Sequence, residues 1–193
     1  MLTLFHAPRS RSSRFIWLLE ELGPHYEIEY VTIQRGDGSG APDPKNPHPH
    51  KQVPALIHDE TLVTESAAIA LYLTDLHPGT GLGPLVGDPG RGAYLTWLAY
   101  YAGVLEPVVV AHSRGASDER DLAAYQALDE RLKATLEAGP YLLGEAFSAA
   151  DILYVSLLQF GRNLLPDHKV YDDYLARLNQ RPAVTRALQK DAP

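Results

Sequence analysis

The chain has 193 residues, and its hydrophobic (45%) and charged (21%) fractions are those of an ordinary globular protein. This length is enough for one large domain or two small ones. The formal net charge of −7 argues against a nucleic-acid-binding surface and against a basic membrane anchor. The sequence has no cysteine, so a disulfide framework, a thiolate metal site and a cysteine nucleophile are excluded.

No targeting segment is expected. Residues 2–5 (LTLF) read as a strand that begins directly after the initiator, not as the charged and apolar regions of a signal peptide. The apolar runs are expected to be too short to span a bilayer, and Glu106-Pro107 interrupts the best candidate among them. We therefore expect a cytoplasmic protein with no membrane partner and no nucleic-acid partner.

The first part of the chain predicts a βαβ unit. A short β-like run at 2–6 precedes a helix at 11–22, in which apolar residues recur at helical spacing. Gly23 and Pro24 end this helix, and a second strand is expected at 26–33. A helix in the crossover between two strands is typical of such a unit.

Residues 34–51 are rich in glycine and proline and predict a loop with at most one helical turn. Strands at 55–58 and 62–64 lie close enough to form an antiparallel hairpin, and a helix then runs to about Leu76. The order β-α-β followed by β-β-α, with a proline before the third strand, indicates a thioredoxin-like α/β domain over residues 1–76.

Residues 77–91 (HPGTGLGPLVGDPGR) form the clearest linker, and beyond it the pattern is helical. Ser148-Ala-Ala-Asp151 predicts a capping box before a helix that is apolar all round. We therefore expect an all-helical domain over residues 92–193. The other helices expected there share regular apolar spacing and cover residues 92–112, 118–138, 171–179 and 183–190.

The stretch from Gln52 to Ser66 combines two anchor points for a ligand. Pro54 cannot donate to a sheet ladder, so it suits the start of a strand after a bend, and a cis bond is one way to make that bend. A cis bond there would leave the backbone of Val53 free to pair with an extended, peptide-like ligand. The next helix opens at Glu65-Ser66, and its first amides have no intrahelical partner and suit a carboxylate.

Three motifs carry a family resemblance: the VPAL turn at 53–56, the ES pair at 65–66 and the S-x-x-D box at 148–151. In this order and spacing they resemble the cytosolic glutathione transferases, over nearly the whole chain. The resemblance implies a homodimer whose interface is lined by the helices near 65–76 and 92–112. It also implies glutathione as co-substrate, bound by Gln52, Val53, Pro54, Glu65 and Ser66.

Each part of the tripeptide has an expected partner under this resemblance. Ser66 and the helix amides meet the γ-glutamyl carboxylate, Glu65 lies nearer the γ-glutamyl amine, and the Val53 backbone pairs with the cysteinyl portion. Gln52 occupies the position that reaches the glycine carboxylate. Its neighbours Lys51 and His50 compete for that role, because PHPHKQ departs from the shorter turn usual before this motif.

Thiol chemistry points to Ser10. The reactive form of glutathione is the thiolate, so the site needs a hydrogen bond to sulfur and a positive potential. Ser10 ends the first loop, directly before a helix start, and Ser10-x-x-x-Arg14 resembles the serine-type classes, which implies that Ser10 is catalytic. The alternative is that Ser10 merely caps the helix. Ser12 and Ser13 are rival hydroxyls, for which capping or packing roles are expected.

Other classes of the family fit less well. The tyrosine-type classes need a tyrosine beside the first strand, where Phe5 stands, and the cysteine-type classes need a cysteine. Tyr94, Trp97 and Tyr101 share one helical face and could line a pocket for an apolar electrophile, although such a stripe is also typical of a core. No metal site is expected, because no His/Asp/Glu cluster has ligand spacing.

The expected function is therefore a glutathione transferase that activates the glutathione thiolate for attack on an apolar electrophile. Two alternatives remain open. A serine-type site also serves glutathione-dependent isomerases and dehalogenases, in which only the electrophile differs. A non-catalytic binding module would keep the fold without turnover.

Overall fold

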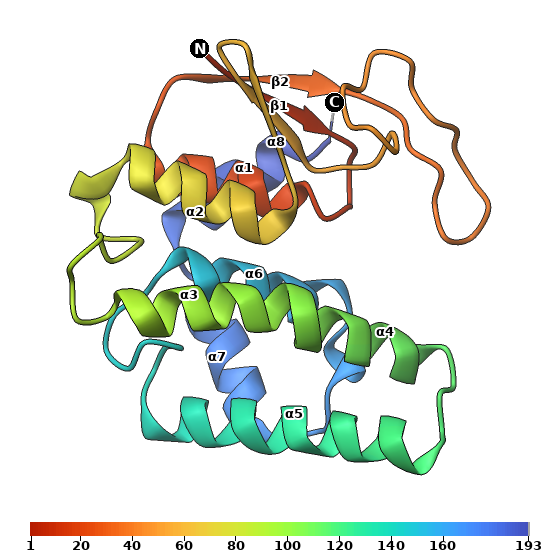
Figure 1. Ribbon diagram of the computed structural model, residues 1–193, viewed down its shortest axis with the longest axis vertical. Helices are drawn as coiled ribbons and strands as arrows, with labels where there is room; N and C mark the ends of the chain where they lie inside the picture. The colour runs from red at the N-terminus through yellow and green to blue at the C-terminus, as the bar shows by residue number, and fades with distance from the viewer. Residues whose placement is uncertain (193) are drawn as a thin grey trace. The chain divides into compact units, whose positions relative to one another are not determined.

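The computed structural model describes residues 1–192 and divides the chain into two compact units. The first comprises Met1–Thr80 together with the segment that begins at Arg181, and the second comprises Gly81–Gln180. In Figure 1 the sheet and helices α1, α2 and α8 belong to the first unit, and helices α3 to α7 belong to the second.

The first unit contains a four-stranded sheet in the order β2-β1-β3-β4. The first two strands are parallel, as a βαβ crossover requires, and the other two pairs are antiparallel. The predicted βαβ unit, the hairpin and the thioredoxin-like arrangement are thereby confirmed. The strands span Leu2–His6 (β1), Tyr26–Tyr30 (β2), Ala55–His58 (β3) and Thr61–Thr64 (β4).

The crossover helix α1 (Ser13–Leu22) packs against β1 and against α2 (Ser66–Leu76), as Figure 1 shows. It ends at Gly23, whose φ of +77° is left-handed and whose N–H donates to the Leu19 carbonyl. Glycine adopts this conformation without the steric penalty of a Cβ, which is why the predicted stop holds. The helix begins two residues later than predicted, because residues 11–12 form a turn.

Helix α8 (Pro182–Lys190) corrects the expected domain boundaries. It packs on α1 and therefore belongs to the first unit. The sequence had predicted that the all-helical domain extends over residues 92–193 and so includes this helix. Arg186 and Lys190 donate to the Glu20 carboxylate at 2.8 and 2.6 Å, and Arg181 donates to Glu21 at 2.5 Å. Complementary charges far apart in the chain fasten the two helices, and a local pattern cannot reveal that pairing.

The long loop after β2 is held by its own side chains. The expected strand at 26–33 ends at Tyr30, and residues 34–51 form turns without a helical turn. Buried Asn46 accepts the His48 N–H at 3.0 Å and donates to the Gln52 carbonyl at 2.9 Å. A short 3₁₀ turn at Pro78–Thr80 ends the N-terminal segment of the first unit.

The second unit is helical, with a core that includes Tyr94, Tyr101 and Tyr154. The Tyr154 hydroxyl donates to the Trp97 carbonyl at 3.0 Å, and its ring meets those of Trp97 and Tyr101 edge-on. Its elements span Arg91–Tyr100 (α3), Tyr101–Leu105 (a π segment), Glu106–Ser113 (α4), Glu119–Ala138 (α5), Ala149–Phe160 (α6), Arg162–Leu164 (a 3₁₀ turn) and Lys169–Asn179 (α7).

Glu106-Pro107 does not interrupt the first helix of this unit, contrary to expectation. Helices α3 and α4 join through the π segment into one helical run, Arg91–Ser113, as Figure 1 shows. The wider π turn before Pro107 accommodates a residue that lacks an N–H. This run is long and apolar enough to cross a membrane by length and composition, a test that core helices of globular proteins also pass. The expectation that every apolar stretch is too short was therefore wrong.

The capping box at the start of α6 is confirmed. The Asp151 carboxylate accepts the Ser148 N–H at 2.8 Å, and the Ser148 hydroxyl caps the amide of Asp151. Asp151 also accepts the Leu142 N–H at 2.8 Å and the Tyr174 hydroxyl at 2.9 Å. Burial raises the pKa of Asp151, and these four donors, counting the Ser148 hydroxyl, counteract that shift.

Candidate functional site

Strand pairing brings the predicted site segments to one edge of the sheet. Phe5, one residue before the end of β1, pairs with Ala55 at the start of β3, so the loop after β1 lies next to Pro54. Ala55 in turn pairs with Thr64, which places Glu65 beside the same turn. The first loop, the proline turn and the start of α2 therefore meet, although the first loop lies tens of residues before the other two in the chain.

The proline turn has the predicted cis Val53-Pro54 peptide bond. The Val53 side chain is buried and packs with Ala7 and Val31, so the turn is fixed against the loop after β1. Its backbone precedes the first paired residue of β3, Ala55. The position is the one from which an extended ligand can continue the pairing.

The start of α2 is strained and carries no side-chain cap. Glu65 has a φ of +68° and a ψ of 125°, a conformation that non-glycine residues rarely adopt and that costs about 1–3 kcal/mol. Within the described residues, no side-chain hydrogen bond caps this N-terminus. Its first amides and the half-buried Ser66 hydroxyl therefore suit an incoming carboxylate.

Ser10 lies half-buried in the loop between β1 and α1. Its hydroxyl donates to the Ala7 carbonyl at 2.7 Å, and its oxygen accepts the Ser12 N–H at 3.2 Å. The second contact resembles capping, but α1 begins only at Ser13 and its N-cap position is Ser12. Ser10 therefore stabilises the turn before the helix, and it is itself only half-buried.

His6 is the site residue that the sequence reasoning missed. It is completely buried at the end of β1, and its Nδ1 lies 2.8 Å from the equally buried Ser12 Oγ. The Ser12 oxygen lies 2.7 Å from the Ser10 oxygen. A signal was available, because strand alternation places His6 on the same face as the core residues Leu2 and Leu4.

The loop that carries Ser10 is fastened from two directions. Arg9 has a left-handed φ of +53°, and its N–H donates to the Asp191 carboxylate at 3.2 Å. Arg35 donates to the Pro8 carbonyl at 2.8 Å. The guanidinium of Arg35 thus reaches this loop and holds the backbone beside Ser10.

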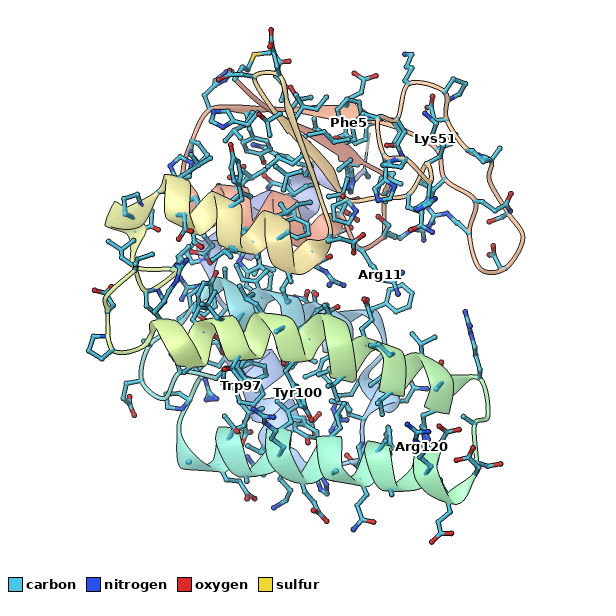
Figure 2. All side chains as sticks on the ribbon, viewed as in Figure 1. Phe5, Arg11, Lys51, Trp97, Tyr100 and Arg120 are labelled. Carbon is cyan, nitrogen blue, oxygen red and sulfur yellow. The ribbon has the colours of Figure 1, made fainter. Side chains whose placement is uncertain are left out.

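The candidates for the glycine end differ in how they are engaged. The Lys51 ammonium donates to the Asn46 carbonyl at 2.6 Å, so it supports the loop. Figure 2 shows Lys51 in the long loop of this unit. The side chains of Gln52 and His50 are exposed, and the Gln52 backbone is held by Asn46. Both exposed side chains remain available to a carboxylate.

The aromatic stripe of the helical unit is largely core. Tyr94 and Tyr101 have no exposed surface, and Trp97 is 7% exposed. Arg131 of α5 lies over the rings of Trp97 and Tyr100, and Figure 2 labels both rings on α3. This packing favours the core alternative for the three residues Tyr94, Trp97 and Tyr101, and their pocket role stays a prediction. Within the described chain, no group of three His, Asp or Glu is placed to hold a metal ion.

Comparisons with known proteins agree with these features. Residues 1–75 match the family model "Glutathione S-transferase, N-terminal domain", and residues 100–186 match "Glutathione S-transferase, C-terminal domain". A crystal structure of a glutathione transferase from Methylococcus capsulatus str. Bath is 31% identical with a TM-score of 0.79, over 99% of this chain and 98% of that one.

Two further relatives cover the whole fold. A sphingomonad glutathione S-transferase complexed with glutathione is 28% identical, with a TM-score of 0.77 and 98% of each chain covered. Disulfide-bond oxidoreductase YfcG of Escherichia coli strain K12 is 28% identical over 209 residues, which cover 98% of this chain and 95% of that protein. On the matched domains, the shared fold and the sequence identity, this chain belongs to the glutathione S-transferase family.

Proposed function

We propose that this protein is a glutathione transferase in which Ser10 stabilises the glutathione thiolate. The observation that carries the proposal is the convergence of the Ser10 loop, the Val53-Pro54 turn and the uncapped start of α2 at one sheet edge. A peptide backbone, a carboxylate and a thiol each find a suitable group there. The similarity to a sphingomonad enzyme complexed with glutathione supports the choice of ligand.

The tripeptide is held at both ends in this proposal. Ser66 and the first amides of α2 bind the γ-glutamyl carboxylate, and the exposed Glu65 lies near the γ-glutamyl amine. The backbone of Val53, with Pro54 fixing the turn, pairs with the cysteinyl residue. Gln52 reaches the glycine carboxylate. With both ends of the tripeptide bound in this way, its cysteinyl sulfur lies next to the loop after β1, beside Ser10.

The chemistry requires the thiol to lose its proton before it reacts. The Ser10 O–H turns from the Ala7 carbonyl to the sulfur and stabilises the thiolate by a charge-assisted hydrogen bond. The N-terminus of α1 adds positive potential. The thiolate then attacks an electrophilic carbon, a carbon–sulfur bond forms, and a leaving group departs with its electron pair. We expect an apolar electrophile, a homodimer and a cytoplasmic location.

Glutathione-dependent disulfide reduction is a second candidate, favoured by the similarity to a protein named disulfide-bond oxidoreductase. Because this chain has no cysteine, both reducing equivalents would come from glutathione. One bound thiolate would attack a substrate disulfide to give a mixed disulfide, and a second glutathione thiolate would release it. Two glutathione molecules become oxidised glutathione, and the substrate leaves as two thiols.

The test is the ultraviolet absorbance of bound thiolate as a function of pH, in wild type and in Ser10→Ala. Loss of a hydrogen bond to an anion, about 1.5–3 kcal/mol, should raise the pKa of the bound thiol by roughly one to two units. Glutathione affinity should change only a few fold, because the tripeptide is held mainly elsewhere.

Ser113→Ala is the matched control, because the Ser113 hydroxyl also donates to a carbonyl three residues earlier, at 2.9 Å. It should behave as wild type. A wild-type protein without a lowered thiol pKa would overturn the proposed activation, and a lowered pKa that survives in Ser10→Ala would overturn the choice of hydroxyl. Turnover rates measured side by side with an aryl halide and with a small disulfide would decide between conjugation and disulfide reduction.

A further inference from the structure

The contacts around Ser12 form a continuous line from His6 to the proposed thiol site. His6 Nδ1 lies 2.8 Å from Ser12 Oγ, and Ser12 Oγ lies 2.7 Å from Ser10 Oγ. Ser10 Oγ lies 2.7 Å from the Ala7 carbonyl oxygen, which can only accept. Ser12 and His6 have no exposed surface, so water cannot substitute for a missing partner.

Counting protons assigns a direction to this line. A hydroxyl has one proton and accepts at most two hydrogen bonds. If Ser10 gives its proton to Ala7, the Ser10–Ser12 contact needs the Ser12 proton. Ser12 Oγ then accepts from the Ala7 N–H, at 3.2 Å, and its other lone pair faces His6 Nδ1. That contact needs a proton on His6 Nδ1.

The opposite direction leaves one short contact without a proton. If His6 Nδ1 lacked a proton, Ser12 would donate to it, and Ser10 would donate to Ser12. The Ser10 and Ala7 oxygen atoms would then lie 2.7 Å apart with no proton between them. In that arrangement the Ser10 proton would also be committed to Ser12, and not to a ligand.

The surroundings of His6 hold its ring in place. Nε2 lies 3.2 Å from the Asp191 carbonyl oxygen and 3.5 Å from its carboxylate, and the Tyr30 ring contacts the imidazole edge-on. Burial lowers the pKa of His6, and the hydrogen bond and negative charge of Asp191 oppose that shift. In the imidazolium both ring nitrogens donate, Nδ1 to Ser12 and Nε2 to the Asp191 carbonyl, whereas the neutral tautomer with a proton on Nδ1 has none on Nε2 for the 3.2 Å contact.

We propose that His6 is a positioning residue, which donates from Nδ1 to Ser12 and thereby keeps the Ser10 proton free for the glutathione sulfur. The inference rests on the proposed role of Ser10 and adds a residue that does not touch the ligand. When glutathione binds, only the Ser10 O–H changes partner, from the Ala7 carbonyl to the sulfur. Without the Nδ1 donor, Ser12 Oγ is free to accept a hydrogen bond from the Ser10 hydroxyl. Ser12 Oγ and the glutathione sulfur then compete for the same proton.

Two substitutions separate the two ring nitrogens. The amide of His6→Asn can place a donor near the former Nδ1 position, and the longer His6→Gln reaches toward Asp191 in place of Nε2. His6→Asn should keep the pKa of the bound thiol within about half a unit of wild type. His6→Gln should raise it, up to the value of Ser10→Ala. His58→Asn is the matched control, because His58 Nδ1 also meets a hydroxyl, that of Tyr72 at 2.8 Å.

A double-mutant cycle tests whether His6 acts through Ser12. In Ser12→Ala there is no hydroxyl to compete for the Ser10 proton, so adding His6→Gln should leave the thiol pKa unchanged. A further rise in the double variant would show a direct electrostatic effect of the ring and overturn the proposal. Melting temperatures of all variants identify those that fail to fold.

Nitrogen-15 chemical shifts of the His6 ring give a test that needs no substitution. A proton on Nδ1 supports the proposal, and an unprotonated Nδ1 overturns it even if the variants do not fold. The outcomes separate the two proposals. A thiol pKa that responds to Ser10→Ala but not to His6→Gln overturns the role of His6 and leaves that of Ser10 intact.

Discussion

Each unit contains a hydrogen-bonded cluster of hydroxyl groups, and the two clusters have similar components but different roles. In the helical unit, the Asp151 carboxylate collects donors from Leu142, Ser148 and Tyr174. In the first unit, His6 and Ser12 align with Ser10. Each cluster joins a titratable side chain to serine hydroxyls next to a helix start.

The difference lies in where each line of hydrogen bonds ends. All partners of Asp151 are fixed within the unit, and Asp151 and Ser148 are both buried, so nothing is left for a ligand. The other line ends at Ser10, which is half-buried and gives its proton to a carbonyl that a stronger acceptor can replace. A closed network stabilises the fold, whereas an open one leaves a polarised group at the surface.

Asp151→Ala should have the largest effect on the closed network. It removes the acceptor for two buried amides and a tyrosine hydroxyl, and each unsatisfied group costs about 1–3 kcal/mol, so we expect a loss of about 3 kcal/mol or more. Denaturant unfolding measures it. Glutathione affinity of the folded fraction should not change. A loss of affinity without a loss of stability would show that the box serves the ligand site.

Ser66→Ala should have the opposite signature. No side chain caps α2 within the described residues, and the proposed partner of Ser66 is the ligand, so removing its hydroxyl should weaken glutathione binding by about 1.5–3 kcal/mol. Stability of the free protein should change little. Calorimetric titration measures the affinity, with Ser113→Ala as control. Unchanged affinity in Ser66→Ala would contradict the assignment of the γ-glutamyl end.

The parts of this contrast that could be predicted are local in the sequence. The capping box, the glycine that ends α1 and the hairpin each depend on residues a few positions apart, and all three are confirmed. The proline turn and the start of α2 lie within fifteen residues. Short spacing in the chain makes such features readable from propensity and periodicity alone.

The parts that could not be predicted depend on distant residues. Asp191 meets His6 and Arg9 across more than 180 positions, and α8 reaches α1 through charges at Glu20 and Arg186. Scattered charges give no periodic signal. Strand alternation did place His6 on the buried face, but its partner Ser12 comes from the following turn. The aromatic stripe fits a core more often than a pocket, and only tertiary packing can decide between them.

Acid unfolding offers a test of the charge cluster between α1 and α8. Burial would raise the pKa of Glu20, but hydrogen bonds from Lys190, Tyr26 and Arg186 outweigh it and lower the pKa to about 2. Because the folded-state pKa lies below the unfolded value of 4.5, the stabilisation is full above pH 4.5 and is lost as pH falls toward 2. Solvent screens the half-exposed cations, so we expect about 1–2 kcal/mol.

Glu20→Gln should remove that part of the pH dependence. Free energies of unfolding measured from pH 6 to pH 2 should then fall less steeply in the variant than in wild type. Exposed Glu60 lies outside the cluster and provides the control variant, Glu60→Gln. A Glu20→Gln curve that runs parallel to wild type would show that the cluster does not anchor α8.

Tyr174→Phe should have a smaller effect than the substitutions above, and it tests how completely the network around Asp151 is closed. It deletes one donor to Asp151, at 2.9 Å, while the amide donors remain, so the expected loss is about 1 kcal/mol. Tyr171→Phe, on the same helix α7, is the matched change. It deletes a 2.7 Å bond to Asp129, whose carboxylate is 15% exposed and is also held by His168.

Water can replace the lost donor at Asp129 but not at the fully buried Asp151. Thermal unfolding should therefore show a larger drop for Tyr174→Phe than for Tyr171→Phe. Neither variant should alter the pKa of the thiol of glutathione bound in the first unit. Equal drops would mean that Asp151 tolerates a missing donor as readily as a partly exposed carboxylate. The closed and the open network would then differ only in the exposure of Ser10.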